Sequence, residues 1–207
     1  MKSAMQWIAA VLLSFFAVCA YAQTIDMKAL VAELQQGGYV IVFRHGATNR
    51  DQADTDPLHP DNIAQQRLLS EQGITVAKQV GEAFKKLGIP LGKAYTSKFN
   101  RAVETGKLVS GGDVTSSLDI TEGGLVVTPI ENDRRAAALK QMAGTMPDAG
   151  KNTLIVTHKP NILDAFGKDW FEVKEGEASV FKPDSAGKAV LVARVQAGDW
   201  IKAASGN

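Results

Sequence analysis

Two short runs of β-branched and aromatic residues limit the possible folds of this chain more than any other feature of its sequence. Residues 39–43 read Tyr-Val-Ile-Val-Phe, and residues 153–157 read Thr-Leu-Ile-Val-Thr. Neither run alternates regularly between polar and apolar side chains, which is typical of strands that are covered on both faces. The two runs therefore predict central strands of a sheet that has helices on both sides.

Helical and strand-like segments alternate along most of the remaining chain. Apolar spacing and helix-ending residues predict helices at residues 26–36, 71–87, 99–109 and 132–146. Shorter or alternating apolar patterns predict strands at residues 93–97, 113–118, 178–182 and 189–195, the last two antiparallel. Residues 49–66 are polar and rich in Asp, which predicts a loop. This order favours an α/β fold, a three-layer sandwich whose mainly parallel central sheet is flanked by helices.

The N-terminus has the layout of a secretory signal peptide. A lysine near the start is followed by an apolar run at residues 8–18 and by small residues at Ala20 and Ala22. The run is too short for a comfortable membrane span. We therefore expect residues 1–22 to be cleaved, residues 23–207 to form one domain, and the mature protein to be exported, either periplasmic or secreted, without stable membrane insertion. An uncleaved N-terminal anchor is the alternative.

Charge and cysteine content exclude several classes of function. The full chain has a formal net charge of +1, and removing residues 1–22 leaves 22 basic and 22 acidic residues. The sequence therefore lacks the excess of basic residues that would indicate nucleic acid as a partner. The only cysteine, Cys19, lies in the expected signal peptide, so the mature domain has neither disulfides nor thiol chemistry. No pattern in the sequence indicates an oligomeric state.

Two histidines stand where the predicted central strands end. His45 follows the first strand and His158 follows the second. In parallel sheets, ligands bind outside the carboxyl ends of the strands. Arg44 and Gly46 flank the first histidine, and Arg101 lies in the first turn of a predicted helix, where anions are favoured. An imidazole nucleophile, arginine forks and a second imidazole are the groups that phosphoryl transfer through histidine requires.

Four ordered motifs give the sequence a family resemblance. Arg-His-Gly-x-Thr occupies residues 44–48, Leu-Ser-x-x-Gly occupies 69–73, and Ser-x-x-x-Arg-Ala-x-x-Thr occupies 97–105. The strand-terminal His158 is the fourth. Together these segments resemble the first branch of the histidine phosphatase superfamily, also called phosphoglycerate mutase-like.

The resemblance implies hydrolysis of a small phosphomonoester through a phosphohistidine intermediate on His45. It implies that Arg44, Arg101 and His158 form the phosphate pocket, and that no metal or cofactor takes part. A phosphomutase, a phosphoanhydride hydrolase on the same site and a non-catalytic phosphate-binding module are the alternatives. Retention of His45 favours an enzyme, because binding alone needs no nucleophile.

The general acid has no unambiguous match to the family pattern. Glu122 is the first candidate, Glu131 is the second, and a solvated loop carboxylate is an equally common state for such a residue. Ala47 also replaces the Glu or Gln that is common in phosphoglycerate mutases.

Several other polar residues favour a structural interpretation. His59 matches no motif and is expected to be a loop residue. Arg134 and Arg135 are expected on a solvated helix face, although an anionic substrate tail could bind them. The acidic residues of the predicted loop fit no calcium motif, so we expect them to be solvated rather than metal ligands. They are Asp51, Asp54, Asp56 and Asp61.

Overall fold

The computed structural model describes residues 26–206, so the expected signal peptide at residues 1–22 lies outside the described residues. Six strands form one sheet in the order β3-β2-β4-β1-β5-β6. The strands are β1 (Val40–Arg44), β2 (Leu91–Ser97), β3 (Thr115–Ser117), β4 (Asn152–Thr157), β5 (Ala178–Pro183) and β6 (Ala189–Val195). The α-helices are α1 (Met27–Gln35), α2 (Glu71–Lys86), α3 (Asn100–Ser110), α4 (Pro129–Ala143), α5 (Lys159–Phe166) and α6 (Ala197–Ser205). Three 3-10 helices, η1 (Ile63–Gln65), η2 (Leu118–Ile120) and η3 (Lys168–Trp170), lie in the connections.

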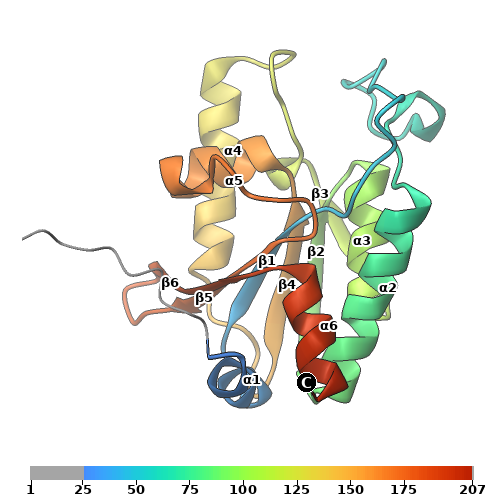
Figure 1. Ribbon diagram of the computed structural model, residues 1–207. Helices are drawn as coiled ribbons and strands as arrows, with labels where there is room; N and C mark the ends of the chain where they lie inside the picture. The colour runs from blue at the N-terminus through green and yellow to red at the C-terminus, as the bar shows by residue number, and fades with distance from the viewer. Residues whose placement is uncertain (1–25, 207) are drawn as a thin grey trace, which may run out of the picture.

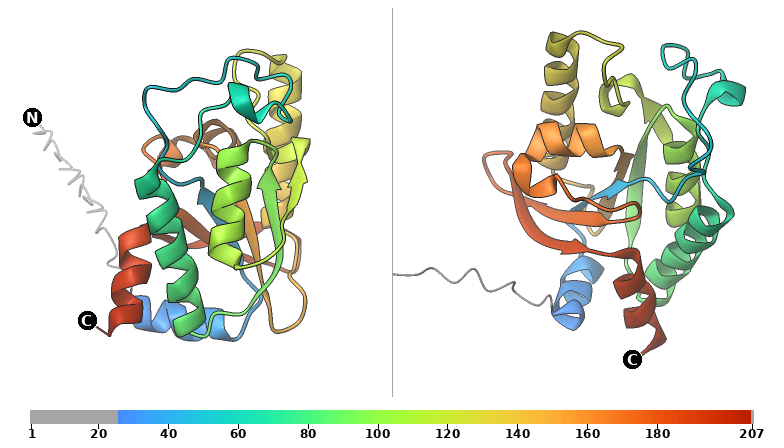
Figure 2. Two further views of the ribbon diagram at one scale, coloured as in Figure 1. Left: turned by 90° about the vertical axis from the view of Figure 1, so that its right-hand side faces the viewer. Right: turned by 45° about the horizontal axis from the view of Figure 1, so that its top comes forward.

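Helices cover both faces of the sheet, which confirms the predicted three-layer α/β sandwich (Figures 1 and 2). Ile41 and Phe43 of β1 face a core that includes residues of α1, α2, α3 and α6. Val40 and Val42 face a second core, which includes residues of α4 and α5. The continuous apolar run thus supplies both cores, because successive side chains of a strand point to opposite faces.

Strand pairing brings the two strand-end histidines to one edge of the sheet. β1 and β4 are parallel neighbours, with Arg44 opposite Thr157 in the register. His45 and His158 therefore leave their strands side by side. β5 and β6 are antiparallel, as expected, and β5 also pairs antiparallel with β1. The sheet is therefore parallel from β3 to β1 and antiparallel beyond it.

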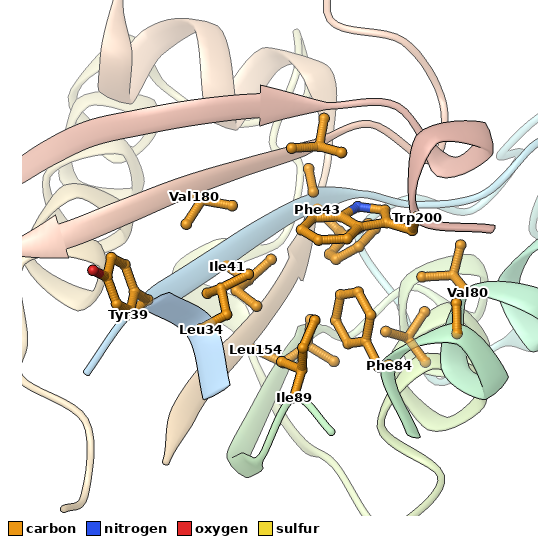
Figure 3. Close-up of a cluster of buried hydrophobic side chains, with 14 of the residues drawn as sticks. Leu34, Tyr39, Ile41, Phe43, Val80, Phe84, Ile89, Leu154, Val180 and Trp200 are labelled. Atoms are coloured by element: carbon orange, nitrogen blue, oxygen red, sulfur yellow. The ribbon is translucent and has the colours of Figure 1, made fainter. Parts of the chain in front are cut away.

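Two helices were not predicted. In α5, Pro160 lies in the first turn, where proline is tolerated because the first helical N–H groups lack partners in any case. In α6, Trp200 is fully buried and its ring packs edge-on against Phe84 at a centroid distance of 5.0 Å (Figure 3). α6 therefore completes the core on the α2 side of the sheet.

Helix α4 begins three residues earlier than predicted. The side-chain oxygen of Thr128 accepts a hydrogen bond from the Glu131 N–H, and Pro129 occupies the first turn. This cap moves the start of the helix toward the loop that carries Glu122. Among residues 26–206, no helix has the length and apolar character that crossing a bilayer requires.

Candidate active site

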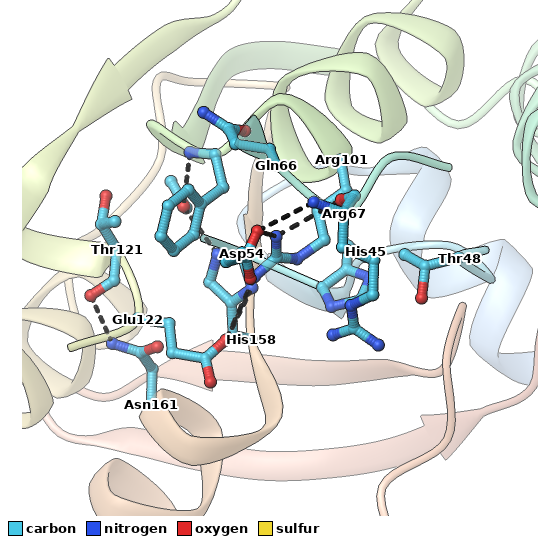
Figure 4. A network of polar contacts seen from close by, with 12 residues as sticks. His45, Thr48, Asp54, Gln66, Arg67, Arg101, Thr121, Glu122, His158 and Asn161 are labelled. Atoms are coloured by element: carbon cyan, nitrogen blue, oxygen red, sulfur yellow. Dashed lines mark hydrogen bonds and ion pairs between the residues drawn. The ribbon is translucent and has the colours of Figure 1, made fainter. Parts of the chain in front are cut away.

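His45 and His158 form the floor of the site at the carboxyl ends of β1 and β4 (Figure 4). Both side chains are buried, and their ring centroids are 5.1 Å apart with the planes tilted by 57°. The backbone N–H of His45 donates to the Thr157 carbonyl at 3.0 Å. The sheet itself therefore fixes the position of both imidazoles.

The geometry at His45 leaves one ring nitrogen free. Its Nδ1 lies 2.8 Å from the carbonyl oxygen of Gly46. A carbonyl only accepts, so a neutral ring carries its proton on Nδ1 and keeps the lone pair on Nε2. Burial and the nearby charge of Arg101 lower the pKa of His45 to about 3. The imidazole is therefore neutral and nucleophilic over the whole physiological pH range.

Arg101 is a fully buried cation beside the histidines. It lies in the first turn of α3, and its guanidinium stacks over the Phe99 ring at 4.5 Å. Nη1 donates to Asp54 Oδ1 at 2.9 Å, and Nη2 lies 3.3 Å from Glu122 Oε2. Nε is buried and has no hydrogen-bond partner among the described residues.

The second and third motifs are joined to the first by hydrogen bonds. The Gly46 N–H donates to Thr105 Oγ1 at 3.0 Å, and that hydroxyl donates to the Arg101 carbonyl at 2.7 Å. Gly73 allows α2 to approach the first motif, because a Cβ there would lie 2.0 Å from the Ala47 carbonyl oxygen. The Gly of Leu-Ser-x-x-Gly is therefore required by close packing.

Arg44 is positioned from the opposite side of the site. Its Nη1 donates to the Val173 carbonyl at 2.8 Å, and its Nη2 lies 3.5 Å from Glu175 Oε1. Burial lowers the pKa of Arg44, and its Nε has no hydrogen-bond partner within residues 26–206. Thr48 donates to the same Glu175 oxygen at 3.2 Å.

His158 has the opposite pattern of ring contacts from His45. Its Nε2 lies 2.6 Å from Ser97 Oγ, and its Nδ1 lies 3.4 Å from Glu122 Oε2. Burial and the charge of Arg101 lower the pKa of His158 well below its usual value. The buried Nδ1 has no hydrogen-bond partner of good geometry in the described chain.

The structure brings Glu122 into the site. The preceding residue, Thr121, is the anchor, because its carbonyl accepts from Arg135 Nη1 at 3.0 Å and from Asn161 Nδ2 at 3.2 Å. The Thr121 hydroxyl also donates a hydrogen bond to the Ser117 carbonyl at 2.7 Å. The Glu122 carboxylate is 29% exposed, so it contacts both the pocket and solvent.

Glu131, the second acid candidate, is engaged elsewhere. Its carboxylate accepts hydrogen bonds from Arg134 and Arg135, which lower the pKa of Glu131 to about 2. A carboxyl group with this pKa is ionised at neutral pH and is a poor proton donor. Arg134 also pairs with Asp119, so the two arginines form an ion-pair network rather than a simply solvated face.

Two further residues of the site were not recognised from the sequence. Arg67 is half-buried, and its charge contributes to lowering the pKa of His45 and of His158 (Figure 4). Asp54 was expected to be solvated, and this was wrong, because its carboxylate binds the buried Arg101. The only sequence signal for Asp54 was the polar character of residues 49–66, from which its partner could not be predicted, and Arg67 follows directly after that segment.

The remaining sequence candidates lie apart from the pocket. His59 is 75% exposed and its Nδ1 lies 2.6 Å from Asp56 Oδ1. Within residues 26–206, no group of three or more His, Cys, Asp or Glu side chains could hold a metal ion.

A polar cavity of about 660 Å³ adjoins the first motif, lined by residues that include Thr48, Ser70 and Glu175.

One family model matches part of the chain. Residues 40–123 match the model of the histidine phosphatase superfamily (branch 1). The matched segment includes the first three of the four sequence motifs, so over this segment the chain is similar to that superfamily. No curated protein sequence matches the chain significantly.

Solved structures share the fold at low sequence identity. The protein histidine phosphatase SixA complexed with tungstate is 17% identical, with a TM-score of 0.54, covering 77% of this chain and 97% of its own. A phosphoserine phosphatase from Entamoeba histolytica, in complex with phosphoserine, is 16% identical, with a TM-score of 0.52, covering 77% of this chain and 97% of its own. YhfR from Bacillus stearothermophilus is 17% identical, with a TM-score of 0.53, covering 74% and 95%.

Proposed function

We propose that this protein hydrolyses phosphomonoesters through a phosphohistidine intermediate on His45. The geometry of His45 carries the proposal. A neutral imidazole is held by its Nδ1 proton on a backbone carbonyl, so Nε2 is free to attack beside a buried arginine. A protein that only binds phosphate needs neither this tautomer nor a depressed pKa.

In the first step, His45 Nε2 forms a bond to phosphorus while the bond to the ester oxygen breaks. We assign Glu122 as the general acid that gives a proton to the departing oxygen, so an alcohol leaves. Arg44, Arg101 and His158 stabilise the charge on the three equatorial oxygens. Support comes from buried donors that lack protein partners in the described chain, namely Arg44 Nε, Arg101 Nε and His158 Nδ1.

In the second step, water attacks the same phosphorus and the bond to His45 Nε2 breaks. Glu122, now a carboxylate, accepts the proton from the attacking water and is restored to its acid form. Inorganic phosphate leaves, and His45 is again neutral. Arg67 adds a third positive charge at the pocket, which favours a dianionic substrate.

The substrate class we infer is a small phosphomonoester. The match of residues 40–123 to the superfamily model supports this, as do solved structures described as complexes with phosphoserine and with 3-phosphoglyceric acid. We also propose that residues 1–22 are a cleaved signal peptide and that the enzyme acts outside the cytoplasm. N-terminal sequencing of the exported protein should then begin at Gln23, whereas a retained Met1 would contradict export with cleavage.

Trapping of the phosphoenzyme tests the mechanism. Wild-type protein, quenched rapidly without acid during turnover of a labelled phosphomonoester, should carry an acid-labile, base-stable label on the peptide that contains His45. His59→Ala is the matched control, since this histidine is exposed and lies outside the pocket. It should retain both label and turnover.

Other outcomes select the alternatives. Tight phosphate binding without hydrolysis would favour a binding module. Transfer of the label to a second alcohol rather than to water would favour a phosphomutase. Hydrolysis of phosphoanhydrides but not of phosphomonoesters would show that the protein is a phosphoanhydride hydrolase.

A further inference from the structure

Asp54 reaches the phosphate pocket from the long loop between β1 and α2. Its Oδ1 accepts hydrogen bonds from Arg101 Nη1 at 2.9 Å and from the Arg67 backbone N–H at 3.0 Å. The side chain is 21% exposed although the loop around it is largely solvent-exposed. In Figure 4, dashed lines join the Asp54 carboxylate to Arg101 and to Arg67. The loop therefore contributes a carboxylate to the site.

The contacts of Arg101 leave one side of its guanidinium for a ligand. Nη1 is engaged by Asp54, and it also lies 3.5 Å from the Arg67 carbonyl. Nε has no partner in the described chain, and Nη2 has only the 3.3 Å contact with Glu122. Bidentate recognition of phosphate needs two parallel N–H groups on one edge of the fork. The Nε–Nη2 edge is the one that remains.

We propose that Asp54 is a positioning residue that orients Arg101 so that its Nε–Nη2 edge faces the substrate phosphate. This inference rests on the proposed function, because it takes the pocket to bind a phosphate group. The Phe99 ring holds the plane of the guanidinium, and Asp54 fixes its rotation within that plane. Preorganisation of this kind removes the cost of ordering the side chain when ligand binds.

The opposite role is a competitor. Asp54 would then occupy a position that phosphate needs, and ligand would have to displace it. The two roles predict opposite signs, because loss of a positioning carboxylate weakens phosphate binding, whereas loss of a competitor strengthens it. The engaged Nη1 lies on the other side of the fork from the free Nε, which supports positioning.

Binding of inorganic phosphate measured by calorimetry tests the proposal. Asp54→Ala should raise the dissociation constant about 10-fold, the lower end of the effect of hydrogen bonds to charged groups. The KM for nitrophenyl phosphate should rise in parallel, with a smaller change in kcat. Asp54→Asn keeps an oxygen for the Arg67 N–H and should give a smaller increase. Asp61→Ala, on the same loop and exposed, is the matched control and should match wild type.

A double-mutant cycle separates positioning from a general effect on the loop. Arg101→Lys keeps the charge but has no fork to orient, so adding Asp54→Ala to it should change phosphate affinity by less than about 2-fold. An equal penalty in both backgrounds, or tighter binding by Asp54→Ala, would overturn the proposal. Wild-type affinity in both Asp54 variants, with hydrolysis intact, would overturn it and leave the proposed function standing. Absence of both hydrolysis and phosphate binding in wild type would refute both.

Discussion

His45 and His158 occupy equivalent places in the fold but differ in which ring nitrogen is held. Each follows the last residue of a buried parallel strand, and each ring is neutral because burial and Arg101 disfavour its charge. His45 is held through Nδ1 by a backbone carbonyl, whereas His158 is held through Nε2 by Ser97 Oγ. The strands thus set the position of both rings, and the local partner sets the chemistry of each.

The consequence is a division of roles between the two rings. His45 has a free Nε2 with a lone pair, which suits a nucleophile. Ser97 Oγ already accepts from the Phe99 N–H at 3.1 Å, so its proton is available to His158 Nε2. That tautomer places the His158 proton on Nδ1, where Glu122 lies 3.4 Å away. In the proposed mechanism, His158 then donates a hydrogen bond to the phosphate through Nδ1.

The largest expected effect comes from exchanging the two histidines for alanine in turn. Removing the nucleophile in His45→Ala should lower kcat by roughly 10⁴-fold or more, and no phosphoenzyme should form. Removing a charge-stabilising donor in His158→Ala should cost about 10²–10³-fold, and the phosphoenzyme should still form slowly. Single-turnover kinetics with labelled substrate measure both. Phosphoenzyme on His158 in the His45→Ala protein would reverse the two roles.

The next effect concerns the carboxylate beside His158. Glu122→Gln should slow hydrolysis of alkyl phosphates by about 10²–10⁴-fold, because a poor leaving group needs a proton. Nitrophenyl phosphate should be affected much less. Glu131→Gln is the control, since its carboxylate is bound by Arg134 and Arg135. Equal losses on both substrates would mean that Glu122 acts only by holding Arg101.

The contrast between the strand ends and the loops explains what could be predicted from sequence. The histidines and Arg101 were identified because hydrophobic periodicity locates strand ends and motif spacing is local. Asp54 was missed because its partner, Arg101, is 47 positions away in the sequence. An irregular loop has no periodic pattern from which such a contact could be predicted. Arg67 was missed for the same reason.

Secondary structure was predicted on the same basis. β1 and β4 were predicted because each contains a run of mostly β-branched residues, and the structure buries both faces of these runs. α5 was missed because a proline in the first turn of a helix resembles a break in the sequence. α6 was missed because Gly198 interrupts a short segment whose stability depends on burying Trp200 against α2.

The two buried neutral histidines should make stability depend on pH. The folded-state pKa of each is lowered, so the unfolded chain binds more protons below about pH 6.5. The free energy of unfolding should therefore fall as pH falls from 6.5 toward 3, with each histidine contributing up to about 1.4 kcal/mol per pH unit. Urea unfolding at several pH values measures this slope. His45→Gln should have a shallower slope than wild type, and an unchanged slope would show that this ring is not buried and neutral.

The smallest effect tests the contact that distinguishes the two rings. Ser97→Ala removes the hydroxyl from His158 Nε2 but leaves the ring, the strand and His45 in place. We expect kcat/KM to fall about 10-fold, in proportion to the loss of roughly one hydrogen bond to a group that faces developing charge. Nitrogen chemical shifts of the imidazoles provide a readout that a purely structural role would not change. In wild type, the His158 proton should reside on Nδ1, and in Ser97→Ala it should move partly to Nε2, while His45 keeps its proton on Nδ1. A normal rate together with a shifted tautomer would show that His158 acts through its bulk alone, and the division of roles between the histidines would then rest on His45.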